Sequence, residues 1–150
     1  MSKKTTKYIR TIICAKSIVE AESNNISLIE LIDAITINTK EPLPKGKPTG
    51  IPLGFEIVSF WTKEKDADDV QIDLKLEALD PKGEVLNSHN GVFTFPKDKQ
   101  NMRFIFKLAG FKVTESGVYL LRLSYKEHGE TEYKLAEETP LALTFQGLQK

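Results

Sequence analysis

The sequence has little cysteine, histidine and tryptophan, and it carries no excess of charge of either sign. Of its 150 residues one is cysteine, one is tryptophan and two are histidines, while Lys plus Arg equals Asp plus Glu at 21 each. The single Cys14 excludes an internal disulfide, which a secreted domain of this size often has. Balanced charge gives no global field that would attract nucleic acid or an anionic membrane. We therefore expect a cytoplasmic protein that binds neither.

Long hydrophobic runs are also missing. A membrane-spanning helix needs about 20 apolar residues, and at the N-terminus Arg10 and Lys16 enclose five uncharged residues, too few for the apolar region of a signal peptide. Delivery as cargo, by a route that the sequence does not reveal, stays open. We attribute the basic residues Lys3, Lys4, Lys7 and Arg10 to a solubilising N-terminal tail, with the tail drawn over residues 1–6 and a single domain over 7–147.

From Phe55 onward apolar and polar residues alternate, which is the pattern of half-buried strands. The apolar series are Ile72, Leu74, Leu76 and Ala78; Phe93 and Phe95; Met102, Phe104, Phe106 and Leu108; Tyr119, Leu121, Leu123 and Tyr125; and Leu141, Leu143 and Phe145. Between the first two series "DPKG" predicts a reversal before Val85, because proline presets φ and glycine accepts positive φ. "SHNG" reads as a further turn before "VFTFP". Short strands at this spacing predict an antiparallel β fold.

The first third of the chain is less regular. "ISLIELIDAITI", residues 26–37, is apolar on both faces, which favours a central strand covered on both sides and paired with "YIRTIICAKSIV" through a turn at "ESNN". A short helix stays open, because Ser27 and Glu30 have the spacing of a capping box. Residues 38–50 contain three prolines and are expected to form an exposed loop, since proline donates no ladder hydrogen bond. "EPLPKGKP" in this loop also resembles a polyproline II ligand.

The segment "ESGVYLL" resembles the DxGxYxC sequence of immunoglobulin domains, with Leu121 in the place of the cysteine. In such a domain Gly117 turns the chain into the strand, and the Tyr119 hydroxyl bonds back to the upstream backbone as a tyrosine corner. Trp61 then corresponds to the core tryptophan. The expected fold class is therefore all-β, an antiparallel immunoglobulin-like or Greek-key β-sandwich of about 7–9 strands.

A wider resemblance covers nearly the whole chain. The order "ICAKSIVEAESNNISLIELIDAITI", "IPLGFEIVSFW", "IDLKLEALDPKGEVL", "FIFKLAGFKVTESGVYLLRL" and "ETPLAL" is similar to that of a family of short, uncharacterised bacterial and phage proteins known as a domain of unknown function. The matching motifs are turn and core signals. The resemblance implies a β-sandwich and carries over no functional residue.

The groups that catalysis or metal binding would need do not form a recognisable motif. His89 and His128 lie in turn-like segments and read as surface histidines, with no zinc-ligand spacing. Cys14 reads as a buried thiol on a strand. Asp66, Asp68 and Asp69 could hold calcium, but Lys63 and Lys65 would oppose a cation, and a solvated loop is the simpler interpretation. The sequence thus predicts no catalytic residue, no metal site and no cofactor.

Two functional hypotheses from different classes follow. The first is a non-enzymatic protein-interaction module, in which a rigid β-sandwich binds another protein, or a second copy of itself, through end loops or an open strand edge. The alternative is a small-ligand or carbohydrate-binding domain with Trp61, Phe60 or Tyr133 as a stacking platform. Four carboxylates read as a polar strand face and not as a glycosidase pair: Glu130, Glu132, Glu137 and Glu138.

Overall fold

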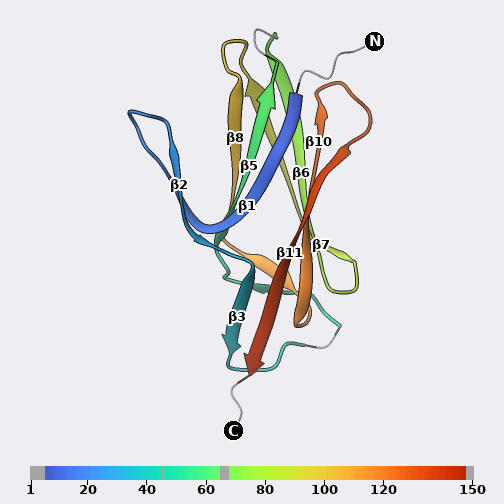
Figure 1. Cartoon of the computed structure of the whole chain (residues 1–150). Coiled ribbons are helices and arrows are strands. Elements are labelled where there is room, and N and C mark those ends of the chain that lie inside the picture. The colour runs from blue at the N-terminus through green and yellow to red at the C-terminus, as the bar shows by residue number, and fades with distance from the viewer. Residues whose placement is uncertain (1–5, 45, 65–67, 148–150) are drawn as a thin grey trace.

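The computed structural model describes residues 6–44, 46–64 and 68–147, and this part of the chain contains strands and no helix (Figure 1). The strands are β1 (Thr6–Val19), β2 (Ile26–Leu31), β3 (Ala34–Thr39), β4 (Thr49–Ile51), β5 (Phe55–Lys63), β6 (Val70–Leu79), β7 (Val85–Phe95), β8 (Asn101–Leu108), β9 (Phe111–Val113), β10 (Gly117–Glu127) and β11 (Lys134–Gly147). The all-β prediction is confirmed. The expected strand number is wrong, because the described residues form eleven strands and not seven to nine.

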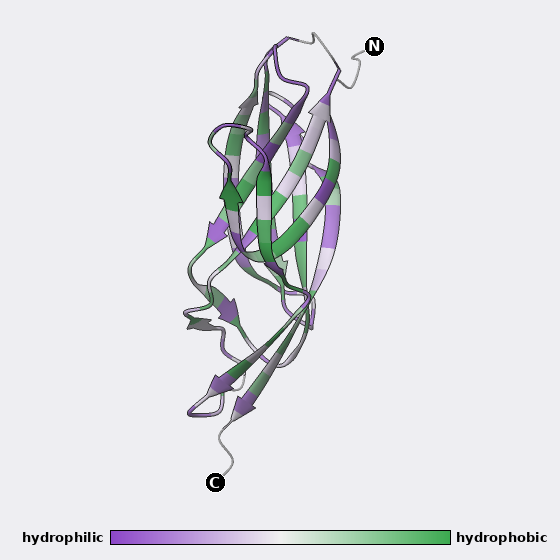
Figure 2. Ribbon diagram, turned by 60° about the vertical axis from the view of Figure 1, so that its left-hand side comes forward, coloured by the Kyte–Doolittle hydropathy of each residue, from purple (hydrophilic) through white to green (hydrophobic). Residues whose placement is uncertain are grey.

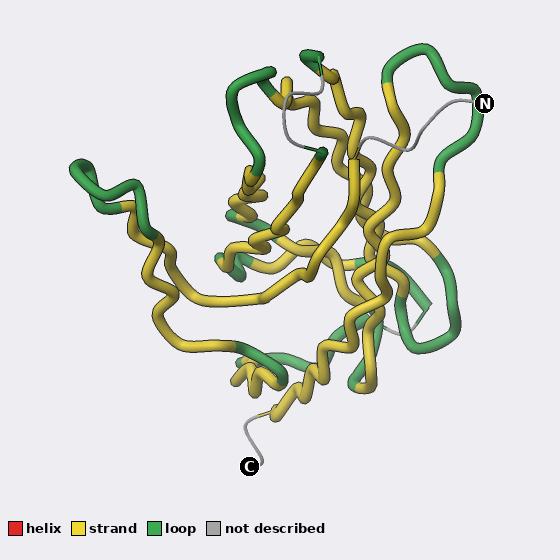
Figure 3. Tube along the Cα trace, turned by 45° about the horizontal axis from the view of Figure 1, so that its top comes forward, coloured by secondary structure: helices red, strands yellow, loops and turns green. Residues whose placement is uncertain are grey.

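The strands, which are yellow in Figure 3, form three sheets. A four-stranded antiparallel sheet has the order β2-β1-β5-β8, and a five-stranded sheet has the order β3-β11-β10-β6-β7. In the five-stranded sheet β3 runs parallel to β11, and the other neighbours are antiparallel. The short strands β4 and β9 form an antiparallel pair of their own.

Side chains from all three sheets meet in one hydrophobic core. Apolar and polar residues alternate along the strands (Figure 2), because successive side chains of a strand point to opposite faces of its sheet. Trp61 of β5 is fully buried there, with its ring edge-on to Tyr8 and Tyr125 at centroid distances of 5.4 and 5.0 Å. Its indole N–H donates to Ser59 Oγ at 2.9 Å. The core therefore satisfies the polar atom of the tryptophan that it buries.

The predicted turn after β6 forms, and Asp80 organises it. One Asp80 carboxylate oxygen accepts the backbone N–H groups of Lys82 and Glu84 at 3.0 and 2.9 Å, and Gly83 adopts a φ of +88°. Strand β7 then begins at Val85, as expected.

The second turn expected in this region, at "SHNG", is wrong because these residues continue β7. His89 pairs with Leu76 and Gly91 with Leu74 in β6. Gly91 allows close packing and does not reverse the chain: a Cβ there would lie 2.6 Å from Cζ of Phe104.

The tyrosine corner predicted from "ESGVYLL" is present. The Tyr119 hydroxyl donates to the carbonyl oxygen of Glu115 at 2.7 Å and accepts the backbone N–H groups of Thr114 and Glu115 at 3.0 and 3.2 Å. Gly117 has a φ of +151°, and a Cβ at this position would approach Cγ of Pro81 to 2.7 Å. Both residues thus have the roles that the sequence assigned to them.

The single strand expected over residues 26–37 is wrong, as is the helical alternative. The segment divides into β2 and β3, which belong to different sheets. Between them the Ile32 N–H still donates to the carbonyl of Ile13, and the carbonyl of Asp33 already accepts the N–H of Ala142. The segment is apolar on both faces because its two halves face different surroundings, and not because one strand is covered on both sides.

The boundaries of the tail and the proline-rich loop also differ from expectation. Strand β1 begins at Thr6, so Lys7 and Arg10 belong to a strand and not to a tail, while Lys3 and Lys4 lie outside the described residues. Asn38 and Thr39 end β3, and Thr49 and Gly50 lie in β4, which leaves a loop at 40–48.

Candidate binding surface

The second half of β1 and strand β2 form a hairpin that projects from the body of the molecule, at the left of Figures 1 and 3. We call residues Cys14–Leu31 the arm. Residues Thr6–Cys14 of β1 pair with β5, whereas Cys14–Val19 pair with β2, which has no other strand neighbour in the described part of the chain. Large apolar side chains on the arm are 44–67% exposed: Ile18, Val19, Ile29 and Leu31.

Polar contacts join the arm to strands β5 and β8. The Glu56 carboxylate accepts the Ser17 hydroxyl at 2.6 Å and the Ser17 N–H at 3.2 Å. In the arm's turn, Asn24 has a φ of +59°, and its backbone and side-chain oxygens accept Arg103 Nη2 at 2.7 and 3.0 Å. The arm is therefore fixed both at its base and at its turn.

The register of three strands brings two arginines to either side of a phenylalanine. Arg10 of β1 pairs with Phe60 of β5, and Phe60 pairs with Arg103 of β8. We call these three residues the arginine row. The Arg10 guanidinium carbon lies 5.5 Å from the centroid of the Phe60 ring, within the range of a cation–π contact. Phe60 is half-buried and lies on the face of β5 opposite to the core residue Trp61.

The arginine row lies in a groove of about 500 Å³ beside the turn of the arm. The groove is lined by Ile9, Arg10, Asn24, Phe60, Trp61, Asn101, Met102 and Arg103. Arg103 contacts only neutral oxygens of Asn24, and within the described ranges neither Arg10 nor Arg103 forms an ion pair. Because a guanidinium stays charged at any physiological pH, the groove carries two positive charges that no carboxylate among the described residues pairs with.

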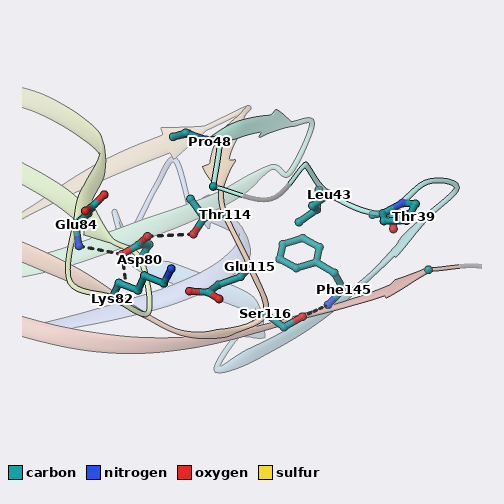
Figure 4. Close-up of a pocket in the computed structure, with 13 residues that line it drawn as sticks. Thr39, Leu43, Pro48, Asp80, Lys82, Glu84, Thr114, Glu115, Ser116 and Phe145 are labelled. Atoms are coloured by element: carbon teal, nitrogen blue, oxygen red, sulfur yellow. Dashed lines mark hydrogen bonds between the residues drawn. The ribbon is translucent and has the colours of Figure 1, made fainter.

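A second cavity, of about 700 Å³, lies where the proline-rich loop crosses the turn after β6 (Figure 4). Its polar groups bond to one another: the second Asp80 oxygen accepts the Thr114 hydroxyl at 3.1 Å, and Ser116 Oγ accepts the Phe145 N–H at 2.9 Å. Burial raises the pKa of Asp80, but the donors from Glu84, Thr114 and Lys82 outweigh it and hold the pKa below 3.8. Asp80 is thus a structural anion and not a general base.

The titratable residues considered for catalysis are not brought together as a site. His89 is half-buried in β7, and His128 is exposed beyond β10, with Nδ1 at 3.5 Å from the Asp73 carboxylate. Cys14 is buried, and its burial and the nearby Glu56 carboxylate raise the pKa of the thiol above 9.0, which leaves it unreactive.

Possible metal ligands do not gather either. In the part of the chain that the structure covers, no group of three or more His, Cys, Asp or Glu side chains could hold a metal ion. Asp69 instead accepts the Lys97 N–H at 2.6 Å, and Lys63 Nζ lies 3.5 Å from the carbonyl oxygen of Asp68. Asp66 and Lys65 lie outside the described residues.

Three of the four glutamates considered as a polar strand face have separate structural contacts. Glu130 lies 3.5 Å from Lys134, Glu138 pairs with Arg122 at 3.1 Å, and Glu137 accepts the Tyr8 hydroxyl. Glu137 and Glu138 lie in β11, whereas Glu130 and Glu132 lie in the loop before it. They form a strand face only in part.

The aromatic residues considered as a stacking platform are separated. Trp61 is in the core, and Phe60 lies in the groove. Tyr133 is 36% exposed, and Lys75 Nζ and Lys126 Nζ lie 4.6 and 4.9 Å from the centroid of its ring. The structure therefore does not present these three rings on one surface.

Comparison of the chain with protein-family models gives no match, and comparison with curated proteins gives none either. Along the described residues no helix is long and apolar enough to cross a membrane. The groove itself was missed from the sequence, because Arg10, Phe60 and Arg103 are distant in the chain and only strand register joins them.

Proposed function

We propose that this protein is a non-enzymatic protein-interaction module built on an immunoglobulin-like β-sandwich. The sandwich interpretation is supported by the core that the two larger sheets share and by the tyrosine corner at the start of β10. A tyrosine corner in immunoglobulin domains lies at the start of the penultimate strand, and β10 is the penultimate strand here. In this architecture loops and sheet faces carry the function while the core supplies rigidity.

The observation that carries the interaction function is the arginine row in its groove. Arginine and aromatic residues are enriched in the centres of protein interfaces, where they supply most of the binding free energy. Here two guanidinium groups without an ion pair among the described residues flank a half-buried ring, whereas Arg122 and Lys134 each have a glutamate partner. Asn24, which lines the groove, belongs to the arm. The exposed apolar side chains of the arm therefore add surface near the groove that a partner protein would cover.

The alternative of a carbohydrate-binding or small-ligand domain loses its support. Its best stacking residue, Trp61, has no exposed surface, and lysines lie against the ring of Tyr133. The larger cavity offers polar groups that already have partners. We therefore retain a protein as the proposed partner.

The test is an affinity capture from lysate of the source cells with three tagged proteins. The wild type is compared with R10Q/R103Q and with the matched control K47Q/K112Q, which loses two positive charges on residues outside the groove. We expect a stoichiometric protein that the wild type and the control retain and the arginine variant loses. Fluorescence of the buried Trp61 verifies that all three proteins are folded. Equal capture by all three would refute this use of the groove.

A further inference from the structure

We propose that the groove binds an acidic, extended segment of the partner protein, with carboxylates on Arg10 and Arg103. This inference rests on the proposed function and adds the chemistry of the partner. The groove carries two permanent positive charges, and its other polar side chains, Asn24 and Asn101, are neutral. An anionic ligand is thus the complement of the charge that the groove exposes.

The geometry favours two carboxylates and not one. Adjacent strands lie about 4.8 Å apart, so the backbones of Arg10 and Arg103, separated by β5, are about 10 Å apart. In an extended peptide, side chains on the same face repeat about every 6.8 Å, and the length of the two arginine and two glutamate side chains covers the difference. Carboxylates two residues apart in an extended segment therefore match the two guanidinium groups.

The identity of the cations also matters. A guanidinium offers a planar fork that matches a carboxylate in a bidentate pair, which a lysine ammonium cannot do. Arg103 already uses Nη2 on Asn24, which fixes the direction of its side chain, and Arg10 is held over the Phe60 ring. Both groups are therefore preorganised, and preorganisation lowers the entropic cost of binding.

A nucleic acid strand fits the same groove less well. Single-strand binding uses a long basic track with several stacking rings, whereas the groove has two arginines and one half-buried ring. The net charge of zero gives no long-range attraction for a polyanion. A short segment with a few carboxylates meets only the two arginines.

The experiment is a fluorescence anisotropy titration with a labelled peptide that has the core Glu-Ser-Glu between Gly-Ser flanks. The same peptide with glutamine in place of glutamate, and a labelled oligothymidylate of equal length, serve as the competing ligands. We expect the glutamate peptide to bind the wild type about tenfold more tightly than the glutamine peptide, with affinity that falls as salt rises. R10Q/R103Q should lose that preference, R10K/R103K should recover it only in part, and K47Q/K112Q should keep it.

The outcomes separate this inference from the proposed function. If the glutamate and glutamine peptides bind equally, if R10Q/R103Q binds like the wild type, or if the oligothymidylate binds best, the acidic-segment inference is overturned. If that happens while the lysate partner is still lost by R10Q/R103Q, the groove remains a protein-binding site of different chemistry. If the lysate partner also fails to depend on the arginines, both proposals fail.

Discussion

Replacing Tyr119 with phenylalanine tests whether the tyrosine corner stabilises this fold. The ring remains, with its edge-on contact to Phe111 at 6.0 Å, so the change removes only the hydroxyl and its three hydrogen bonds. A hydrogen bond contributes about 1 kcal/mol net. Thr114 is only half-buried and Glu115 is exposed, so water can replace part of the loss. We expect the free energy of unfolding to fall by about 2 kcal/mol.

The assay is urea unfolding followed by the fluorescence of Trp61, which is the only tryptophan and lies in the core. In a separate thermal unfolding experiment, a loss of about 2 kcal/mol should lower the Tm of a chain of this size by about 4–8 °C. Tyr133→Phe is the matched control, because it deletes the same atom from an exposed ring, and surface changes of this kind stay within about 0.5 kcal/mol. A loss in Tyr119→Phe no larger than in the control would refute the reasoning.

Three further predictions concern the same core and its turns. Gly117→Ala places a Cβ 2.7 Å from Pro81 at a positive φ and should lower the free energy of urea unfolding by about 1–3 kcal/mol; Gly110→Ala, whose nearest neighbour is 3.7 Å away, is the control, and equal losses would contradict the steric argument. The Asp80 carboxylate, with its pKa held below the ordinary value, contributes stability that is present above the ordinary pKa of aspartate and is lost as the pH falls through the folded-state pKa. Acid unfolding of Asp80→Asn should lack this component, and an unchanged acid profile would count against it. The Cys14 thiol, with its pKa raised by burial, contributes stability that is present below the ordinary pKa of cysteine and is lost as the pH rises through the folded-state pKa. Cys14→Ala should therefore flatten the decline of the free energy of urea unfolding at alkaline pH.

Local signals explain which parts of the fold could be predicted. The reversal at Asp80–Gly83 and the tyrosine corner at Tyr119 each depend on fewer than ten consecutive residues, and both formed as expected. The errors fall where distant residues decide. Gly91 lies within a strand because Phe104 packs over it, and residues 26–37 divide because β11 provides a second pairing partner for β3.

The candidate site could not be predicted from short stretches of sequence either, because its residues are distant from one another in the chain. The sequence assigns Arg10 to a tail and Phe60 to a stacking platform, and it gives no signal for Arg103. Their common surface depends on the registers of β1 with β5 and of β5 with β8. The exclusion of catalytic motifs needed only composition and spacing, whereas a surface assembled from three strands requires the register of each pair.

The parallel pairing of β3 with β11 has a consequence for the synthesis of the protein on the ribosome. Ala34 of β3 pairs with Ala142 of β11, so β3 cannot form its ladder until β11, more than 100 residues later in the sequence, has been synthesised. Contacts so distant in sequence slow folding, because the entropy of closing a long loop is lost before the contact forms. During that delay the nascent chain exposes β3 and the apolar arm before it, a state that is prone to aggregation. Truncation of the last strand would make this state permanent.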